Sequence, residues 1–276
     1  MVKKVTIRTF LKKKREGEKI TMLTAYDYPS ARILDRAGID AILVGDSLGM
    51  VIQGHETTLP VTVDEMLYHV KAVRRGVERA MVIADMPFLS YQTGRDDAIY
   101  NAGLMLKEGG ADAVKLEGGE RVAGLVEDLV GIGIPVMGHI GLTPQSVNVL
   151  GGYRVQGKTG EDIDRLRRDA KALEDAGVFA IVLESVPVEV AKEITDMLKV
   201  PTIGIGAGPH TDGQVLVFHD YLGIFEDIKP RFVKRYRELG QEILSATREY
   251  IEDVKSGRFP APEHCFYLEK KTSQED

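Results

Sequence analysis

Three consecutive apolar runs in this sequence end on an acidic residue. Asp46 follows AILVG, Asp85 follows MVIA, and Glu117 follows AVKL. Three carboxylates with no Cys or His cluster beside them form a hard oxygen donor set, which suits Mg²⁺ with water or substrate completing the coordination. The alternative is that each acid only caps the helix or turn that follows its run, which is common for a single Asp. We favour the metal site because three such acids occur on consecutive runs.

Other polar side chains stand at the ends of similar runs. Lys115 lies two residues before Glu117, so both side chains point the same way on a strand; Lys115 then pairs with a substrate anion, forms a salt bridge with Glu117, or does both. Glu184 ends AIVLE and is our candidate general base or acid, with a structural ion pair as the alternative. His139 either contacts the substrate or forms a structural hydrogen bond. Ser47 supplies a hydroxyl group, and no nucleophile motif surrounds it.

The apolar runs that carry these residues alternate with amphipathic segments. The runs are short, rich in Val, Ile and Leu, and apolar on both faces, which is typical of buried parallel strands. We expect strands at 20–27, 41–47, 81–87, 113–119, 135–141, 180–185, 201–208 and 214–220. The amphipathic segments predict helices at 29–38, 62–76, 96–110, 160–177 and 187–198, with a weaker pattern at 120–133. Thr62 and Glu65 have the spacing of a capping box at the start of the second helix.

Eight strands that alternate with helices fit either a closed (β/α)₈ barrel or an open doubly wound sheet. The number of strands, the lack of a dinucleotide-binding glycine motif after the first strand, and the polar residues at many strand ends favour the barrel. We therefore predict an α/β fold with a single TIM-type barrel domain over residues 1–266. A short N-terminal helix would cap its bottom, a long charged helix at about 230–256 would close it as the eighth helix, and residues 267–276 would form a flexible tail.

Composition narrows the classes of function. The 276 residues carry a formal net charge of −6 and no basic stripe, which argues against a nucleic-acid partner. No apolar run approaches the roughly 20 residues that span a bilayer, so we expect no membrane segment. The N-terminus lacks the apolar stretch and cleavage site of a secretory signal. With Cys265 as the one cysteine, we expect a protein without internal disulfides in the reducing cytoplasm.

The sequence leaves open the roles of two long loops and of a glycine motif. The loops at 48–60 and 142–160 contain several glycines and would lie at the active face, where they act either as lids or as subunit contacts. The motif GIGAG at 204–208 stands where many barrels bind phosphate, but it suits a tight turn after a strand equally well.

A set of longer motifs carries a resemblance to a known family. LVGDSLGMVIQGHETTLPVTVDEM (43–66), ADMPF (84–88), VKLEGG (114–119), GHIGLTPQSVN (138–148), GGYRVQGK (151–158), LESVP (183–187) and IGIGAG (203–208) together resemble ketopantoate hydroxymethyltransferases. The likeness runs from about residue 24 to about residue 263. It implies a (β/α)₈ barrel that transfers a hydroxymethyl group from 5,10-methylenetetrahydrofolate to 3-methyl-2-oxobutanoate through a Mg²⁺-stabilised enolate. The product, 2-dehydropantoate, lies on the route to pantothenate and coenzyme A.

This resemblance implies roles for the residues at the strand ends. Asp46, Asp85 and Glu117 fall on the Mg²⁺ ligand positions, Asp46, Ser47, Asp85 and Lys115 on the contacts to the 2-oxo acid, and Glu184 on the proton acceptor. His139 is a further candidate for a substrate contact. The implied partners are the 2-oxo acid, methylenetetrahydrofolate as co-substrate, and further copies of the chain in a homo-oligomer, typically a decamer.

Two other functions are compatible with the same residues. Barrel enzymes of the phosphoenolpyruvate mutase and isocitrate lyase type also bind 2-oxo acids through Mg²⁺ and acidic strand ends. The motifs at 138–148 and 151–158, and the lack of the reactive Cys motif of the lyases, argue against that type. A non-catalytic metabolite-binding barrel is the second alternative, and the complete set of acids together with Lys115 argues against it.

Overall fold

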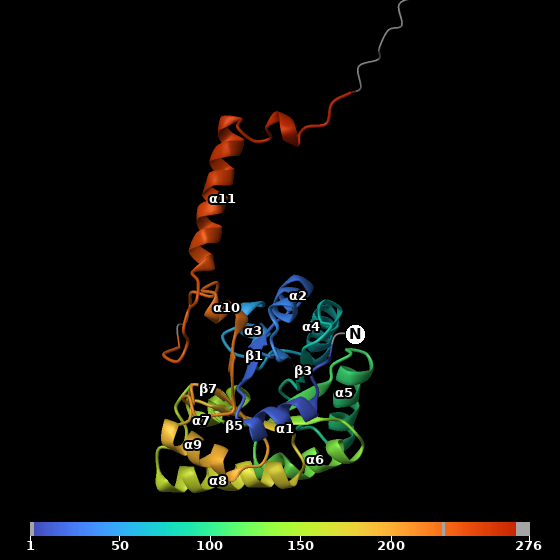
Figure 1. Ribbon diagram of the computed structural model, residues 1–276, viewed down its shortest axis with the longest axis vertical. Coiled ribbons are helices and arrows are strands. Elements are labelled where there is room, and N and C mark those ends of the chain that lie inside the picture. Colours follow the sequence, from blue (N-terminus) through green and yellow to red (C-terminus); the bar gives the residue numbers. More distant parts are fainter. Residues whose placement is uncertain (1–2, 228–229, 269–276) are drawn as a thin grey trace, which may run out of the picture.

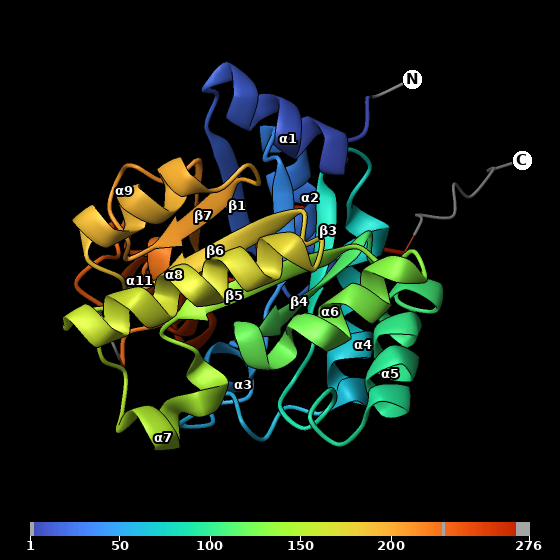
Figure 2. The ribbon, with the colours of Figure 1, turned by 90° about the horizontal axis from the view of Figure 1, so that it is seen from below.

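The computed structural model describes residues 3–227 and 230–268 and contains a closed barrel of eight parallel strands (Figures 1 and 2). Each strand pairs with the next in the chain, and β8 pairs with β1 to complete the barrel. The strands are β1 (Ile20–Thr24), β2 (Ala41–Val44), β3 (Met81–Asp85), β4 (Ala113–Glu117), β5 (Val136–Gly141), β6 (Ala180–Glu184), β7 (Thr202–Ile205) and β8 (Gly213–Leu216). The predicted (β/α)₈ fold is confirmed, with strands shorter than the apolar runs.

Helices cover the outside of the barrel (Figure 2). They are α2 (Tyr28–Ala37), α4 (Val63–Gly76), α5 (Arg95–Lys107), α6 (Glu120–Gly131), α8 (Gly160–Asp175) and α9 (Val188–Met197). The capping box predicted for α4 is present, because Thr62 Oγ1 accepts a hydrogen bond from Glu65 N and the Glu65 carboxylate accepts one from Thr62 N. Asp27 accepts a hydrogen bond from Ser30 N at 2.8 Å and caps α2. Capping is therefore the role of this acid, which follows β1.

The N-terminal helix α1 (Ile7–Glu16) lies across the bottom of the barrel, as predicted. The ring of Phe10 is fully buried and packs edge-on against Phe179, which directly precedes β6, with 5.6 Å between the ring centroids. Lys14 Nζ lies 2.8 Å from Asp212 Oδ2, just before β8. The helix thus seals the end of the barrel that lies opposite the expected active face.

The long C-terminal helix does not close the barrel, and that part of the prediction was wrong. α11 (Leu239–Ser256) has no buried residue and extends away from the barrel (Figure 1). The chain after β8 forms the short helix α10 (Phe218–Tyr221) instead, so the strand predicted at 214–220 ends at Leu216. An amphipathic pattern shows that a helix has an apolar face to bury, but it does not show against which surface this face packs. No helix within residues 3–227 and 230–268 is both long and apolar enough to cross a membrane.

Side chains that point into the barrel alternate with side chains that point toward the helices. Ile20 and Met22 of β1, Met81 and Ile83 of β3, and Ile203 of β7 belong to one buried cluster that fills the interior. The same period of two continues toward the carboxyl ends of the strands. There the apolar side chains give way to ionisable ones.

Candidate active site

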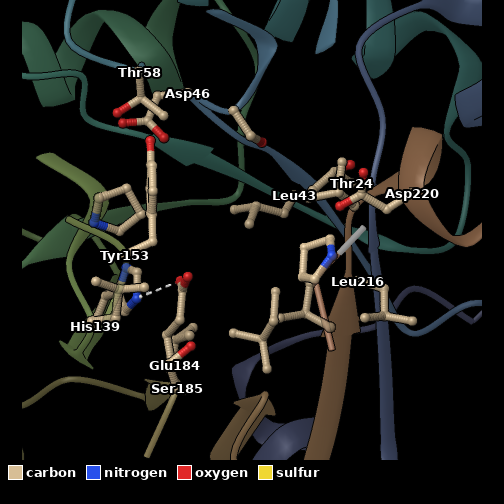
Figure 3. Close-up of a pocket in the computed structure, with 18 of the residues that line it drawn as sticks. Thr24, Leu43, Asp46, Thr58, His139, Tyr153, Glu184, Ser185, Leu216 and Asp220 are labelled. Carbon is tan, nitrogen blue, oxygen red and sulfur yellow. Dashed lines mark ion pairs between the residues drawn. The ribbon is translucent and has the colours of Figure 1, made fainter. Parts of the chain in front are cut away.

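The alternation along the strands carries ionisable residues into the barrel mouth. In β3 the inward series Met81 and Ile83 continues with Asp85, and in β4 the series continues with Lys115 and Glu117. The pocket at this mouth has a volume of about 460 Å³ (Figure 3). It brings together all the site residues predicted from the sequence: Asp46, Ser47, Asp85, Lys115, Glu117, His139 and Glu184.

The register of neighbouring strands sets the contacts of Lys115. Asp85 lies opposite Lys115 in the pairing of β3 with β4, and Asp85 Oδ1 is 3.0 Å from Lys115 Nζ. Lys115 Nζ also lies 3.1 Å from His139 Nδ1 on β5. The lysine therefore forms its ion pair with Asp85, whereas the sequence had suggested Glu117 as the partner.

Burial of the acids raises their affinity for protons. Asp46 is 4% exposed and Asp85 is 3% exposed. Desolvation raises the pKa of Asp46 well above its usual value, and the negative charges of Asp85 and Glu117 raise it further. Desolvation also raises the pKa of Asp85, although Lys115 acts in the opposite direction. This cluster has a surplus of buried negative charge, which an added cation would stabilise.

His139 lies between the lysine and two glutamates. Its Nδ1 is 3.4 Å from Glu117 Oε1, and its Nε2 is 3.2 Å from Glu184 Oε2 (Figure 3). Burial and Lys115 disfavour a positive charge on the ring, but the contacts with Glu117 and Glu184 outweigh them and raise the pKa of His139 to about 9. The imidazole therefore lies within ion-pair distance of the Glu184 carboxylate, which lines the pocket.

Gln145 is a buried residue of the site that the sequence reasoning did not identify. Its Nε2 donates to Asp46 Oδ2 at 2.8 Å, and its backbone N–H donates to Glu117 Oε2 at 3.0 Å. Tyr91 OH donates to Gln145 Oε1 at 2.7 Å, which fixes the orientation of the amide. Gln145 thus holds one oxygen of each of two acids. Its sequence signal is its place in the motif GHIGLTPQSVN, in a loop whose path no local pattern predicts.

The turn after β2 places Ser47 beside the acids. Asp85 Oδ2 accepts a hydrogen bond from the backbone N–H of Asp46 at 3.0 Å, and Ser47 Oγ lies 2.8 Å from the hydroxyl of the buried Tyr26. A Cβ at Gly45 would come within 2.7 Å of Ser47 Oγ, so a side chain there would displace the serine. The sequence GDS therefore builds a turn that points both polar residues at the pocket.

The acid cluster supplies the oxygen donors that Mg²⁺ prefers. Asp85 Oδ1 is buried and forms no hydrogen bond among the residues described, although Lys115 is close to it. This oxygen and the surplus negative charge fit a divalent cation held among Asp46, Asp85 and Glu117. Within the described ranges, no three acidic, His or Cys side chains are already grouped around one point that would hold a metal. A cation there would require at least one of these side chains to turn toward it.

Both long loops reach the pocket. The loop 48–60 begins with α3 (Leu48–Val51) and contributes Met50, and the loop 142–160 contributes Tyr153. Tyr153 OH lies 3.7 Å from Met50 Sδ, so the two loops contact each other at the pocket. This contact is the one expected if the loops act as a lid.

The motif GIGAG forms a tight turn after β7. Gly206 and Gly208 have φ angles of 65° and 76°, in the left-handed region that favours glycine. A Cβ at Gly206 would lie 2.8 Å from the ring of Phe232, and one at Gly208 would lie 2.7 Å from a methyl group of Val188. Apolar side chains cover these glycines. Of the two roles that the sequence left open, a structural turn is therefore favoured over a phosphate-binding site.

Comparison with known proteins places the chain in a family. The family model for ketopantoate hydroxymethyltransferase matches residues 4–262. The chain belongs to this family. It is 59% identical over 265 residues to the 3-methyl-2-oxobutanoate hydroxymethyltransferase of Carboxydothermus hydrogenoformans, with 96% of each chain covered. The enzyme of the same name from Trichlorobacter lovleyi is 57% identical over 266 residues, which cover 96% of this chain and 100% of the relative.

Solved structures share the fold of this ketopantoate hydroxymethyltransferase family member at low sequence identity. One is a 2,3-dimethylmalate lyase of the PEP mutase/isocitrate lyase superfamily, with a TM-score of 0.58 and 19% identity over 97% of this chain and 91% of the other. Another is a phosphonopyruvate hydrolase in complex with oxalate and Mg²⁺, with a TM-score of 0.61 and 14% identity over 96% and 93% of the two chains. These likenesses support the barrel, and they do not transfer an activity.

Proposed function

We propose that this protein is a 3-methyl-2-oxobutanoate hydroxymethyltransferase. It transfers the one-carbon unit of 5,10-methylenetetrahydrofolate to C3 of 3-methyl-2-oxobutanoate and forms 2-dehydropantoate for the synthesis of pantothenate and coenzyme A. The observation that carries the proposal is the buried cluster of acids, Lys115 and Glu184 around one pocket, in a chain of this family. The relative from Carboxydothermus hydrogenoformans, which is named for this activity, is 59% identical to it over 265 residues.

The charged side of the pocket fits the 2-oxo acid, an anion with a carboxylate next to a ketone. Burial opposes the charge on Lys115, but Asp85 and the neighbouring acids outweigh it and raise its pKa, so the ammonium group stays charged. It attracts the oxygens of the substrate. Ser47 adds a hydroxyl donor and His139 a ring N–H, while Asp46 and Asp85 approach the substrate through the cation that they hold.

Mg²⁺ is the proposed cofactor, with Asp46, Asp85 and Glu117 as its ligands. When bound, it polarises the ketone of the 2-oxo acid and stabilises the negative charge that forms when the C3 proton leaves. The surplus of buried negative charge supports this assignment. Gln145 fixes one oxygen of Asp46 and one of Glu117, and so limits the ways in which these ligands turn.

Glu184 is the proposed acceptor of the C3 proton. It ends β6, which lies opposite β2 in an eight-stranded barrel, so its carboxylate faces the acid cluster across the pocket (Figure 3). The His139 ring lies 3.2 Å from this carboxylate and attracts it when the ring is protonated. C3 then forms a bond to the methylene carbon of the donor. Both bonds from that carbon to N5 and N10 of the folate break, and water supplies the hydroxyl oxygen. The second proton of the water and the proton taken up by Glu184 go to the two nitrogens, and tetrahydrofolate leaves.

We propose that this reaction takes place in the cytoplasm, without a nucleic-acid or membrane partner. Both substrates are small anions in free solution. The formal net charge of −6 provides no attraction to nucleic acid.

We also propose that the enzyme is a homo-oligomer, with a decamer as the number that the family resemblance implies. α11 exposes four aliphatic side chains and one aromatic ring, which are 42–58% accessible: Ile243, Leu244, Tyr250, Ile251 and Val254. A helix without a buried residue gains little packing energy from its own chain, and a second copy could cover its apolar face without another kind of partner. Sedimentation of the full chain and of a chain that ends at residue 238 tests this role. The shortened chain should form a smaller assembly, and an unchanged assembly would exclude α11 from the interface.

The deciding assay follows tetrahydrofolate formation from methylenetetrahydrofolate. Formation should require 3-methyl-2-oxobutanoate, stop after treatment with a chelator, and return when Mg²⁺ is added. An enzyme of the phosphoenolpyruvate mutase or isocitrate lyase type would instead act on phosphonopyruvate or cleave a carbon–carbon bond without folate. A non-catalytic barrel would bind the 2-oxo acid and produce no tetrahydrofolate.

A further inference from the structure

The pocket has a second side that the 2-oxo acid does not need. Its volume of about 460 Å³ lies in the range of cavities that hold drug-sized ligands, and the 2-oxo acid is much smaller than these. The acids, Lys115 and His139 all lie on the side formed by β2 to β6. The other side is mostly apolar: it is lined by Ile205, Leu216, Val217, Phe225 and Phe232, with the exposed Arg231 beside Phe232.

A single carboxylate interrupts this apolar side. Asp220 belongs to α10, lines the pocket and is half-buried. In Figure 3 it lies beside Thr24, away from His139 and Glu184. Its carboxylate has no hydrogen-bond or ion-pair partner in the described part of the chain, and the only opposing charge that acts on it is that of Arg235, at longer range. A carboxylate in such surroundings is unfavourable unless a ligand brings hydrogen-bond donors to it.

This carboxylate is mostly ionised near pH 7. Burial raises the pKa of Asp220 to about 6, with Arg235 acting in the opposite direction, so the acceptor form prevails at neutral pH. An ionised carboxylate offers two parallel acceptor oxygens. It pairs best with a group that presents two adjacent N–H donors in one plane.

The wall next to Asp220 suits a flat ring. The ring of Phe232 packs on Gly206, where a Cβ would approach it within 2.8 Å, so the glycine allows the aromatic side chain to lie close to the barrel. Phe232 keeps 37% of its surface exposed, and Phe225 also lines the pocket. Aromatic walls with one oriented polar group are typical of sites that bind planar heterocycles.

We propose that the apolar side of the pocket is the subsite for the pterin ring of the one-carbon donor, with Asp220 accepting hydrogen bonds from its ring N–H and its neighbouring amino group. The proposal rests on the function proposed above, which requires a folate in this pocket, and it names the residue that recognises it. The amino-pyrimidinone edge of a pterin presents the two adjacent donors that a carboxylate binds.

The charges of the pocket assign the two substrates to different sides. The carboxylate of the 2-oxo acid is repelled by Asp220 and attracted by Lys115, which is 5% exposed and surrounded by acids that keep it charged. The pterin ring is uncharged and gains nothing from Lys115. The benzoyl-glutamate tail of the folate is anionic, so it would also avoid Asp220. The donor edge of the pterin is therefore the part of either substrate that matches this carboxylate.

The test measures binding of tetrahydrofolate itself, by calorimetric titration in the presence of Mg²⁺ and 3-methyl-2-oxobutanoate. The wild-type protein is compared with Asp220→Asn, and with Asp64→Asn as a matched control at an exposed acid outside the pocket. Each protein is titrated with tetrahydrofolate and with a tetrahydrofolate analogue that lacks the 2-amino group. Loss of a hydrogen bond to a charged group should weaken binding by about 10- to 100-fold.

We expect the wild type and Asp64→Asn to prefer tetrahydrofolate over the analogue by this factor, and Asp220→Asn to lose both the affinity and the preference. In turnover, Asp220→Asn should raise KM for methylenetetrahydrofolate much more than KM for the 2-oxo acid. A wild type that binds both folates equally overturns the proposal even if the variant fails to fold. The proposal is also overturned if Asp220→Asn keeps the full preference for tetrahydrofolate over the analogue. If the wild type forms tetrahydrofolate in the same experiments, the proposed function still stands. A wild type that binds no folate overturns both.

Discussion

The two sides of the pocket differ in how their charged side chains are buried and paired. On the acidic side, the charges are almost fully buried, and each is held by its neighbours: Asp85 by Lys115, Asp46 and Glu117 by Gln145. On the apolar side, Asp220 is half-buried and held by nothing in the described part of the chain. A fixed cluster in a dry site acts strongly on charge that develops during a reaction. A lone acceptor in a mostly apolar wall instead recognises an uncharged group that donates hydrogen bonds, such as the pterin ring.

Removing an acid from the acidic side should have the largest effect. Asp85→Ala, or Asp46→Ala, takes away a proposed Mg²⁺ ligand, and Asp85→Ala also removes the ion-pair partner of Lys115. We expect Mg²⁺-dependent binding of 3-methyl-2-oxobutanoate to disappear. Calorimetric titration with and without Mg²⁺ measures this, and a thermal melt shows whether each variant is folded. Affinity that stays unchanged in a folded variant would count against the metal role of that acid.

Glu184→Gln should separate binding from turnover. The amide keeps the size of the side chain but accepts no proton, so 2-oxo-acid binding should persist while kcat falls by about 10²- to 10⁴-fold. Glu189→Gln, at an exposed glutamate in the first turn of α9, is the matched control. Steady-state rates of tetrahydrofolate formation measure both variants. A near-normal rate in Glu184→Gln would falsify its assignment as the proton acceptor.

The acidic side was the more predictable of the two, and the reason is geometric. Side chains on a strand alternate with a period of two, and parallel strands of a barrel end at one face, so Asp85, Glu117 and Glu184 were expected to meet from their positions alone. Gln145 and Asp220 lie outside regular strands. Their places depend on how a loop and a short helix fold back over the mouth, which no local pattern encodes.

The end of β8 illustrates this limit. The apolar pattern of 214–220 favoured a strand that would have included Asp220. In the fold, Thr24 Oγ1 accepts a hydrogen bond from the backbone N–H of Phe218 at 2.9 Å, and the chain turns into α10. One side-chain contact from β1 thus redirects the chain. Likewise, α11 shows the amphipathic pattern of a barrel helix, but that pattern does not specify that the barrel should cover it.

Gln145→Leu tests whether the acidic side depends on the hydrogen bonds that hold it. Leucine has a similar size and forms none of the amide contacts with Asp46 and Tyr91, so the Asp46 carboxylate should be free to rotate. Loss of such a supporting contact typically weakens metal binding by about 10- to 100-fold. Titration with Mn²⁺, followed by electron paramagnetic resonance, measures affinity without turnover. Gln92→Leu, which removes a contact of 3.4 Å to Gln145 and one of 3.4 Å from the Tyr91 backbone N–H, is the control. Equal Mn²⁺ affinity in both variants would show that Gln145 only fills space.

Phe232→Ala should give the smallest effect and confine it to the apolar side. Full burial of a phenylalanine side chain is worth roughly 1.5–3 kcal/mol. Because Phe232 is already partly buried against Gly206, and 37% of it is exposed, a ligand would cover only the remainder. We therefore expect KM for methylenetetrahydrofolate to rise by about 3- to 10-fold, where 1.4 kcal/mol corresponds to tenfold. KM for the 2-oxo acid should stay within about twofold, because no charge of the acidic side is altered.

Kinetics with each substrate varied in turn make the comparison. If both KM values rose together, the two sides would not bind their ligands independently, and the separation of the 2-oxo acid from the uncharged pterin ring across the pocket would be wrong.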